Sequence, residues 1–386
     1  MSPGARGVAA RARRLVVKVG SSVLTRDGRV RPRVFTDVAR QVAALQDEGR
    51  EVVLVSSGAI AIGSHALGWS HPGRSIPEKQ AAAAVGQIGL SEIYKRRFAA
   101  HGKPVAQVLV TRTGLEDRER FLNARHTLLT LLRLGVVPVV NENDTVATEE
   151  IRFGDNDNLS ATVVNLVAAE LLVILTNVDG LYAEPPTRSR PRPPLVERVD
   201  EITPEIERAA RGASSAFGRG GMLTKLEAAR SAARSGAATV VCNGLAPDSL
   251  LRVARGEPAG TIFLAGTKLG SRKHWLAYTA APRGRLVLDD GAVRALLERG
   301  RSLLPAGIAS VEGRFGIGDP VACVDARGRE VARGLVAYTA AEVDRIKGLS
   351  TKEALRVLGY SNGDEVIHRD DLVLLEPRPQ GAGARG

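Results

Sequence analysis

Short apolar runs rich in β-branched residues alternate along this chain with segments of helical periodicity. The runs cover residues 15–19, 52–56, 105–110, 136–140, 171–175 and 239–241, and the helical segments between them cover 34–48, 79–100, 121–134, 159–169 and 221–235. Continuous apolar runs are typical of parallel strands that helices cover on both faces. The alternation therefore predicts the α/β class, as a three-layer α/β/α sandwich with a mainly parallel sheet.

Composition excludes several other classes of protein. Hydrophobic residues make up 44% of the 386 residues and charged residues 25%, the balance of a folded globular chain. The two cysteines, Cys242 and Cys323, form no CxxC motif, so neither a disulfide framework nor a thiolate zinc site is expected. The longest apolar stretch, 161–176, is interrupted by Asn165 and Glu170. We therefore expect no membrane span, no secretory leader and a cytoplasmic location.

The pattern changes after the last helical segment, which indicates a second domain. Residues 321–324 and 331–336 flank a turn, two short helices are expected near 341–347 and 351–358, and a final strand near 372–375. We predict a disordered extension at 1–13, a catalytic α/β domain at 14–276, a small mixed-β domain at 283–377 and a disordered tail at 378–386.

The formal charge of +12 raises the question of nucleic-acid binding. The second part of the chain, residues 281–386, is close to neutral, with 16 basic and 15 acidic side chains. Strong phosphate-driven binding by that domain is therefore not favoured, although RNA binding stays possible. Only nine of the 54 basic residues are lysine, so each lysine is an informative choice.

Polar and small residues follow the predicted strands, where parallel α/β sheets place their ligands. Lys18 precedes the turn Gly20-Ser21-Ser22, which suits an anion, although a strand-end lysine can also simply extend into solvent. Ser57 and Gly58 form a similar turn, which could bind a carboxylate or phosphate or only cap a helix.

The densest polar cluster comprises residues 141–144 and 154–158, which include Asp144, Asn156 and Asp157. Such groups can hold an ammonium, position lysines or meet Mg²⁺ through water, and the alternative is turn and cap chemistry. Thr176 and Asn177 end the most apolar strand, where they could frame a nucleotide or form an ordinary turn.

A glycine-rich segment, 218–225, opens a predicted helix with Thr224 and Lys225 in its first turn. Free N–H groups, the helix dipole and a lysine together favour a phosphate cradle over a flexible surface loop.

Taken in order, these segments resemble the glutamate 5-kinase family of the amino-acid kinase superfamily over nearly the whole chain. The resemblance is carried by KVGSSVL, SSGAIAIG, EDRERFLNARHTL, VVPVVNENDTVA, FGDNDNLSA and GGMLTK. Residues 283–377 are similar to a PUA domain, which elsewhere binds RNA. Two positions depart from the family pattern: Asn177 stands where aspartate is usual, and Arg219 where a small Thr or Ser is usual.

The resemblance implies ATP-dependent phosphorylation of the L-glutamate γ-carboxylate to L-glutamyl 5-phosphate, the first step of proline biosynthesis. It implies that Lys18, Lys225 and Asp157 are catalytic and that Ser57, Gly58, Asp144 and Asn156 bind glutamate. The implied ATP-binding residues are Lys18, Thr176, Asn177, Arg219, Gly220, Gly221, Met222, Leu223, Thr224 and Lys225. Magnesium is expected on the ATP phosphates, with no direct protein ligand.

The same resemblance implies feedback inhibition by L-proline, with residues 116–125 as a mobile charged loop beside the glutamate site. It also implies a homo-oligomer and glutamyl phosphate reductase as a pathway partner. Two alternatives stay open. The first is a sister kinase for N-acetylglutamate or aspartate, although Asp144 and the neighbouring Glu142 favour a free ammonium. The second is an enzyme whose nucleotide site has decayed at Asn177 and Arg219.

Overall fold

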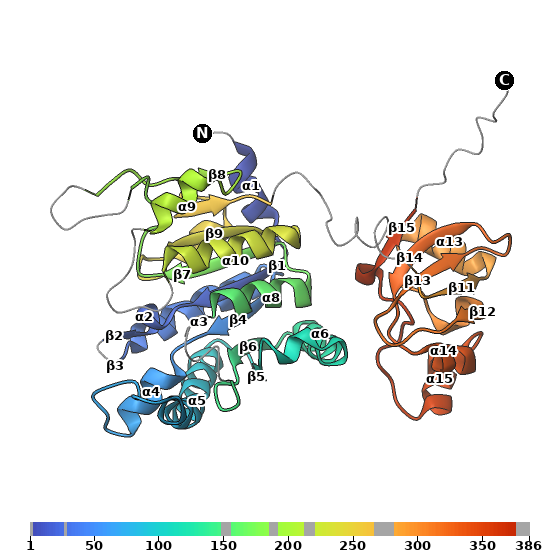
Figure 1. The fold of residues 1–386 in the computed structure, drawn as a ribbon, viewed down its shortest axis with the longest axis horizontal. Helices are drawn as coiled ribbons and strands as arrows, with labels where there is room; N and C mark the ends of the chain where they lie inside the picture. The colour runs from blue at the N-terminus through green and yellow to red at the C-terminus, as the bar shows by residue number, and fades with distance from the viewer. Residues whose placement is uncertain are drawn as a thin grey trace. The chain divides into compact units, whose positions relative to one another are not determined.

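The computed structural model describes residues 3–26, 29–147, 156–184, 192–211, 221–265 and 282–375 of the chain. The chain divides into two compact units, Met1–Lys268 and Leu269–Gly386 (Figure 1).

The first unit is built on an eight-stranded sheet with the order β5-β6-β4-β1-β7-β9-β10-β8. The strands are β5 (Val105–Val110), β6 (Val137–Glu142), β4 (Glu51–Ser56), β1 (Arg14–Val19), β7 (Leu171–Thr176), β9 (Ala238–Asn243), β10 (Thr261–Phe263) and β8 (Arg198–Val199). Neighbours pair in parallel except β9 and β10, which are antiparallel. The predicted, mainly parallel sheet is confirmed, and all six predicted strands belong to it.

Helices cover both faces of this sheet. One face carries α3 (Pro32–Asp47), α4 (Ala59–Ala66), α5 (Ile76–Ala99) and α11 (Ser249–Ala254), and the other carries α6 (Arg118–Arg133), α8 (Asp157–Val167), α9 (Pro204–Arg211) and α10 (Met222–Arg234). A one-turn helix, α2 (Ser21–Leu24), and a small hairpin of β2 (Thr25–Arg26) and β3 (Arg29–Val30) follow β1. The predicted three-layer sandwich is therefore confirmed.

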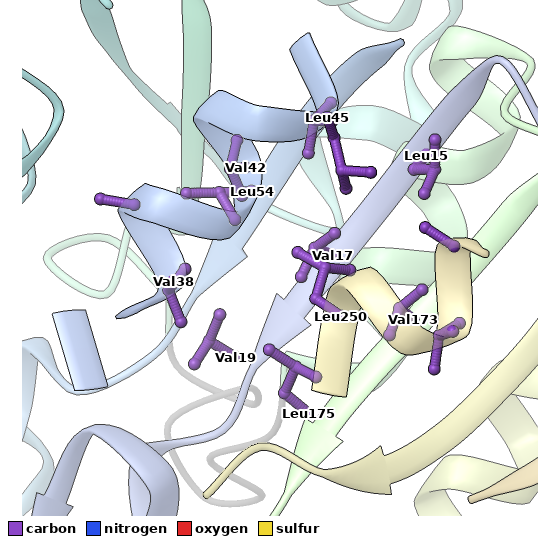
Figure 2. Close-up of a cluster of buried hydrophobic side chains, with 14 of the residues drawn as sticks. Leu15, Val17, Val19, Val38, Val42, Leu45, Leu54, Val173, Leu175 and Leu250 are labelled. Atoms are coloured by element: carbon purple, nitrogen blue, oxygen red, sulfur yellow. The ribbon is translucent and has the colours of Figure 1, made fainter. Parts of the chain in front are cut away.

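Alternate residues of strand β1 face opposite sides of the sheet, so this one strand contributes to both hydrophobic cores. Leu15, Val17 and Val19 pack under α3 and α11, as Figure 2 shows, whereas Val16 belongs to the core on the opposite face. Successive strand residues point to opposite faces, so a central strand with helices on both sides must be apolar at nearly every position. The exception in β1 is Lys18, which shares the side of Val16.

Helices α4 and α5 meet through two glycines. A Cβ on Gly63 would lie 1.7 Å from the Ala82 carbonyl oxygen, and one on Gly86 would lie 1.8 Å from that of Ala59. No side chain fits at either position, so the two backbones touch. The contact holds the turn that precedes α4 close to α5.

The prediction of a disordered extension at 1–13 is wrong for the described part of that segment. Helix α1 (Pro3–Arg11) forms there, and Ala9 and Ala12 are buried. The Arg50 guanidinium donates hydrogen bonds to the carbonyl oxygens of Ala9, Ala10 and Ala12. These carbonyls at the helix end need partners, and the partner comes from a distant part of the chain. The domain end predicted at 276 and the tail predicted at 378–386 lie outside the described residues.

The second unit holds a five-stranded mixed sheet with the order β12-β11-β13-β14-β15. Its elements are β11 (Gly284–Leu288), α13 (Asp290–Arg299), η3 (Pro305–Gly307), β12 (Ile308–Gly313), β13 (Pro320–Val324), β14 (Glu330–Leu335), α14 (Ala340–Ile346), α15 (Thr351–Leu358), η4 (Arg369–Asp371) and β15 (Leu372–Leu374). The predicted mixed-β class, the β13–β14 hairpin and the two short helices are confirmed. Strands β11 and β12 and helix α13 were not among the predicted elements.

We predict that Gly86→Ala destabilises the first unit, because the added methyl group would overlap the backbone of α4. Overpacking of this kind costs about 1–3 kcal/mol, and we expect the free energy of unfolding to fall by about 2 kcal/mol. Gly89→Ala in the same helix is the matched control, since its Cβ would meet only the Ile62 side chain, at 3.1 Å. Urea denaturation followed by circular dichroism tests the pair, and equal midpoints would contradict the backbone contact.

We also predict that residues 1–280 fold without the second unit. The two hydrophobic clusters of the first unit contain buried residues between Ala9 and Phe263, and that of the second contains residues between Leu286 and Leu372. Because the described cores share no residue, each unit should keep its own cooperative transition. Calorimetry should show the transition of residues 1–280 within about 5 °C of its position in the full chain. A collapsed transition would show that the units depend on each other.

Candidate active site

The loops that follow the parallel strands meet at one edge of the sheet. The Gly20 N–H donates to the Leu175 carbonyl of β7 at 3.1 Å, and the Ser57 N–H donates to the Val19 carbonyl of β1 at 3.2 Å. The polar turns after β1, β4 and β7 are therefore neighbours in space, although they are far apart in sequence. This edge is where open parallel sheets bind ligands.

Lys18 is the only charged residue of β1 beyond Arg14, and it is almost completely buried, with 4% of its surface exposed. A buried ammonium is costly unless an anion lies beside it. Its Nζ lies 2.5 Å from Oδ1 of Asp157. The alternative of a lysine that reaches into solvent is therefore wrong.

Asp157 is the first residue of α8 and is fully buried. Its Oδ2 accepts hydrogen bonds from Lys225 Nζ at 3.0 Å and from Thr224 Oγ1 at 2.9 Å. A carboxylate at a helix N-terminus is stabilised by the helix dipole. One carboxylate thus joins β1, α8 and α10, and it holds the two lysines that the resemblance marks as catalytic.

Lys225 lies in the first turn of α10 and is 5% exposed. Both burial and the positive end of the helix dipole disfavour a cation at this position. A residue placed against local preferences is a candidate for function. Lys18, Lys225 and Asp157 together carry one net positive charge, which suits an anionic ligand.

The implied glutamate-binding residues lie beside this group. Asn156 directly precedes Asp157, and Ser57 and Asp144 follow the neighbouring strands β4 and β6. Both Ser57 and Asp144 are half-buried. Gly58 immediately precedes α4 as its N-cap residue and has a φ of 105°, a left-handed conformation that favours glycine.

The implied nucleotide-binding residues are only partly described. Thr176 is buried at the end of β7, and Asn177 after it is exposed. Gly221 caps α10, and Met222, Leu223 and Thr224 open its first turn with Lys225. Arg219 and Gly220 lie outside the described residues.

Asp179, for which no role was predicted, connects the loop after β7 to the end of β9. Asp179 accepts hydrogen bonds from Asn243 Nδ2 at 2.9 Å and from the Tyr182 hydroxyl at 2.8 Å. These two donors hold the pKa of the Asp179 carboxyl below its usual range. The contact supports the backbone around Thr176 and Asn177.

Residues 116–125 do not form the mobile charged loop that was expected. The 3₁₀ turn η1 (Gly114–Glu116) leads into α6, whose first turn is capped by Asp117 through the Arg120 N–H at 3.0 Å. Arg125 is 1% exposed and donates to the Leu166 carbonyl near the end of α8. Asp117 and Arg125 therefore serve the helix and its packing.

Sequence reasoning placed Asn141 in the polar cluster without a role, and it missed Gln87. Asn141 Oδ1 accepts from Asn156 Nδ2 at 2.8 Å, and Asn141 Nδ2 donates to Gln87 Oε1 of α5 at 2.8 Å. Gln87 lies within the long helix α5, where no sequence motif marks it. Only its contact with Asn141, which lies in a different element of the fold, identifies Gln87 as part of this group.

The residues that the structure describes contain neither a candidate membrane span nor a candidate metal cluster. No helix there has the length and apolar character that crossing a membrane requires. No group of three or more His, Cys, Asp or Glu side chains among them is arranged to hold a metal ion.

Comparison with known proteins yields matches to both units. The amino acid kinase family model matches residues 13–243, and the PUA domain model matches residues 284–358. The glutamate 5-kinases of Paraburkholderia phymatum and Paraburkholderia xenovorans are each 54% identical over 372 residues, and that of Burkholderia thailandensis is 53% identical. Each match covers 96% of this chain and 100% of the relative. Among solved structures, an isopentenyl phosphate kinase of T. acidophilum in its product complex matches with a TM-score of 0.45 and 18% identity, over 64% of this chain and 99% of that one.

Proposed function

Since this chain belongs to the glutamate 5-kinase family of the amino acid kinases, we propose that it transfers the γ-phosphoryl group of ATP to the γ-carboxylate of L-glutamate. The products are L-glutamyl 5-phosphate and ADP, and the reaction is the first step of proline biosynthesis. The observation that carries the assignment to this site is the pair of buried lysines joined by Asp157 at the carboxyl edge of the sheet.

The chemistry needs charge neutralisation rather than a general base. A γ-carboxyl group, with an ordinary pKa of about 4.3, is already ionised at neutral pH. The barrier lies in bringing an anion onto a polyanion and aligning it with the γ-phosphorus. Two preorganised ammonium groups lower that barrier by stabilising the charge on the transferring phosphoryl group.

The described residues divide these tasks. Lys18 and Lys225 stabilise the phosphoryl group in the transition state, and Asp157 orients both ammonium groups. Gly221 and the first N–H groups of α10 would receive phosphate oxygens, since a helix N-terminus favours anions.

Magnesium, when bound with ATP, would neutralise part of the phosphate charge. Both oxygens of Asp157 already contact ammonium groups. This arrangement favours phosphate oxygens over Asp157 as the ligands of the ion.

On the acceptor side, Asp144 pairs with the α-ammonium of glutamate, and Ser57 with Gly58 offers a turn to a carboxylate. A sister kinase for N-acetylglutamate would have no ammonium for Asp144 to bind. Assays of the purified enzyme with glutamate, N-acetylglutamate and aspartate, with the acyl phosphate trapped by hydroxylamine, test the proposal. Product with glutamate alone supports it, and a preference for either other acceptor contradicts it.

We predict that Lys18→Ala and Lys225→Ala each lower kcat at least about 10²-fold, the scale for loss of one preorganised charge stabiliser. The KM for glutamate should change much less. Lys103→Ala is the control. Lys103 precedes β5, at the edge of the sheet opposite the carboxyl edge, and its ammonium lies 2.6 Å from the exposed Asp47 carboxylate. A variant of Lys18 or Lys225 with near-normal kcat would remove that lysine from the mechanism.

We predict that Asp144→Asn raises the glutamate KM by about tenfold or more, because it removes the charge that pairs with the substrate ammonium. The KM for ATP should stay unchanged. Asp200→Asn, at a surface ion pair with Arg198, is the control. An unchanged glutamate KM would exclude Asp144 from the site.

Feedback inhibition by L-proline, a homo-oligomeric state and glutamyl phosphate reductase as a pathway partner belong to the same proposed function. Proline carries the α-carboxylate and α-nitrogen of glutamate but lacks the γ-carboxylate. It can therefore occupy the glutamate anchor without reacting.

We predict that proline competes with glutamate, and that Asp144→Asn raises the proline inhibition constant together with the glutamate KM. Inhibition kinetics at varied glutamate and varied ATP measure both effects. Competition with ATP alone would contradict a shared anchor.

A further inference from the structure

The side-chain amide of Asn156 has a defined orientation. Its Nδ2 donates to the main-chain carbonyl of Ser56 at 2.7 Å. A main-chain carbonyl can only accept, so the nitrogen must face it. The second amide hydrogen goes to Asn141 Oδ1 at 2.8 Å. Both donors of Asn156 are therefore used, and its carbonyl oxygen, to which no described residue donates, can serve only as an acceptor.

The chain of hydrogen bonds continues from Asn156 through Asn141 to Gln87. We call these three amides the relay. Asn141 is buried, and its Nδ2 donates to Gln87 Oε1 at 2.8 Å. The side-chain nitrogen of Gln87, Nε2, donates to Ser91 Oγ at 3.2 Å, one turn further along α5. If the Asn141 amide were reversed, its NH₂ group would face that of Asn156, and two donors would oppose each other. The Ser56 carbonyl thus fixes Asn156, and the acceptor on Gln87 fixes Asn141 so that its oxygen faces the second Asn156 hydrogen.

Helix α5 also contacts the end of β4, which carries the Ser56 carbonyl that orients Asn156. Ser56 ends β4 just before α4, its hydroxyl lies 2.9 Å from the Tyr94 hydroxyl of α5, and Tyr94 is fully buried. Burial raises the pKa of Tyr94, so the hydroxyl stays neutral and can donate. Helix α5 thus holds both the strand end and the amide that anchor Asn156.

Glutamate presents two carboxylates and one ammonium, and of these only the ammonium donates hydrogen bonds. A carbonyl oxygen repels a carboxylate but accepts from an ammonium. We propose that Gln87, acting through Asn141, is a positioning residue for substrate specificity that, together with the Ser56 carbonyl, keeps the Asn156 carbonyl available to the substrate ammonium. This inference rests on the proposed function, because it takes glutamate as the acceptor and Asn156 as part of its site.

The test separates recognition of the ammonium from general support of the fold. Glutarate has both carboxylates of glutamate but no ammonium, so it should bind without using the Asn156 carbonyl. In Gln87→Met, which keeps the length of the side chain and removes its acceptor, we expect the glutamate KM to rise about tenfold, as for loss of one charged hydrogen bond. The inhibition constant of glutarate and the KM for ATP should stay unchanged.

Two further variants control the experiment on the full-length enzyme. Gln87→Glu keeps an oxygen acceptor for Asn141 and should restore a near-normal glutamate KM. Gln46→Met makes the same change in α3, where the Gln46 amide donates to the Gly135 carbonyl at 3.5 Å, and should have no effect. An unchanged glutamate KM in Gln87→Met, or a parallel rise in the glutarate constant, would overturn the inference while the proposed function stands. Failure of the unaltered enzyme to phosphorylate glutamate would overturn both.

Discussion

The contact of Asp157 with Lys18 and Lys225 is the interaction on which the rest of the first unit depends. Three buried charges are tolerated only because each ammonium meets a carboxylate oxygen, and removing one partner of a buried pair costs about 3–5 kcal/mol. The same contact joins β1, α8 and α10. Stability and the proposed catalysis therefore require the same geometry, since a misplaced helix would leave a buried charge unpaired and would also move a lysine of the proposed site.

The chain departs from local preferences where the proposed chemistry requires it. Lys18 interrupts an otherwise apolar central strand, and Lys225 places a cation at the positive end of a helix. Gly63 and Gly86 leave α4 and α5 without side chains at their crossing. Each departure would weaken an isolated element. Together they bring charge to the carboxyl edge of the sheet and hold the adjacent turn close to α5.

Asn156 and Asp157 connect the two halves of the site because they are consecutive. Asp157 faces the lysines that would meet the phosphoryl group, and Asn156 is held by β4 and β6, where the acceptor would bind. The start of α8 therefore joins the two lysines to strands β4 and β6. At the other end of this helix, the Arg125 guanidinium donates to the Leu166 carbonyl. Helix α8 is therefore held at both ends.

The sequence by itself determined the layered fold, because periods of 2 and 3.6 report which faces are buried and depend only on neighbouring residues. It also marked Lys18, Asp157 and Lys225, since a rare lysine or a carboxylate after an apolar strand has few structural uses. Only the tertiary structure decided that one carboxylate serves both lysines and that residues 3–11 form a docked helix. It also decided that residues 118–125 belong to α6 and that Gln87 contacts Asn141, the partner of Asn156. Each of these depends on a partner from a distant element, and local sequence carries no record of which distant group completes a hydrogen bond or caps a helix.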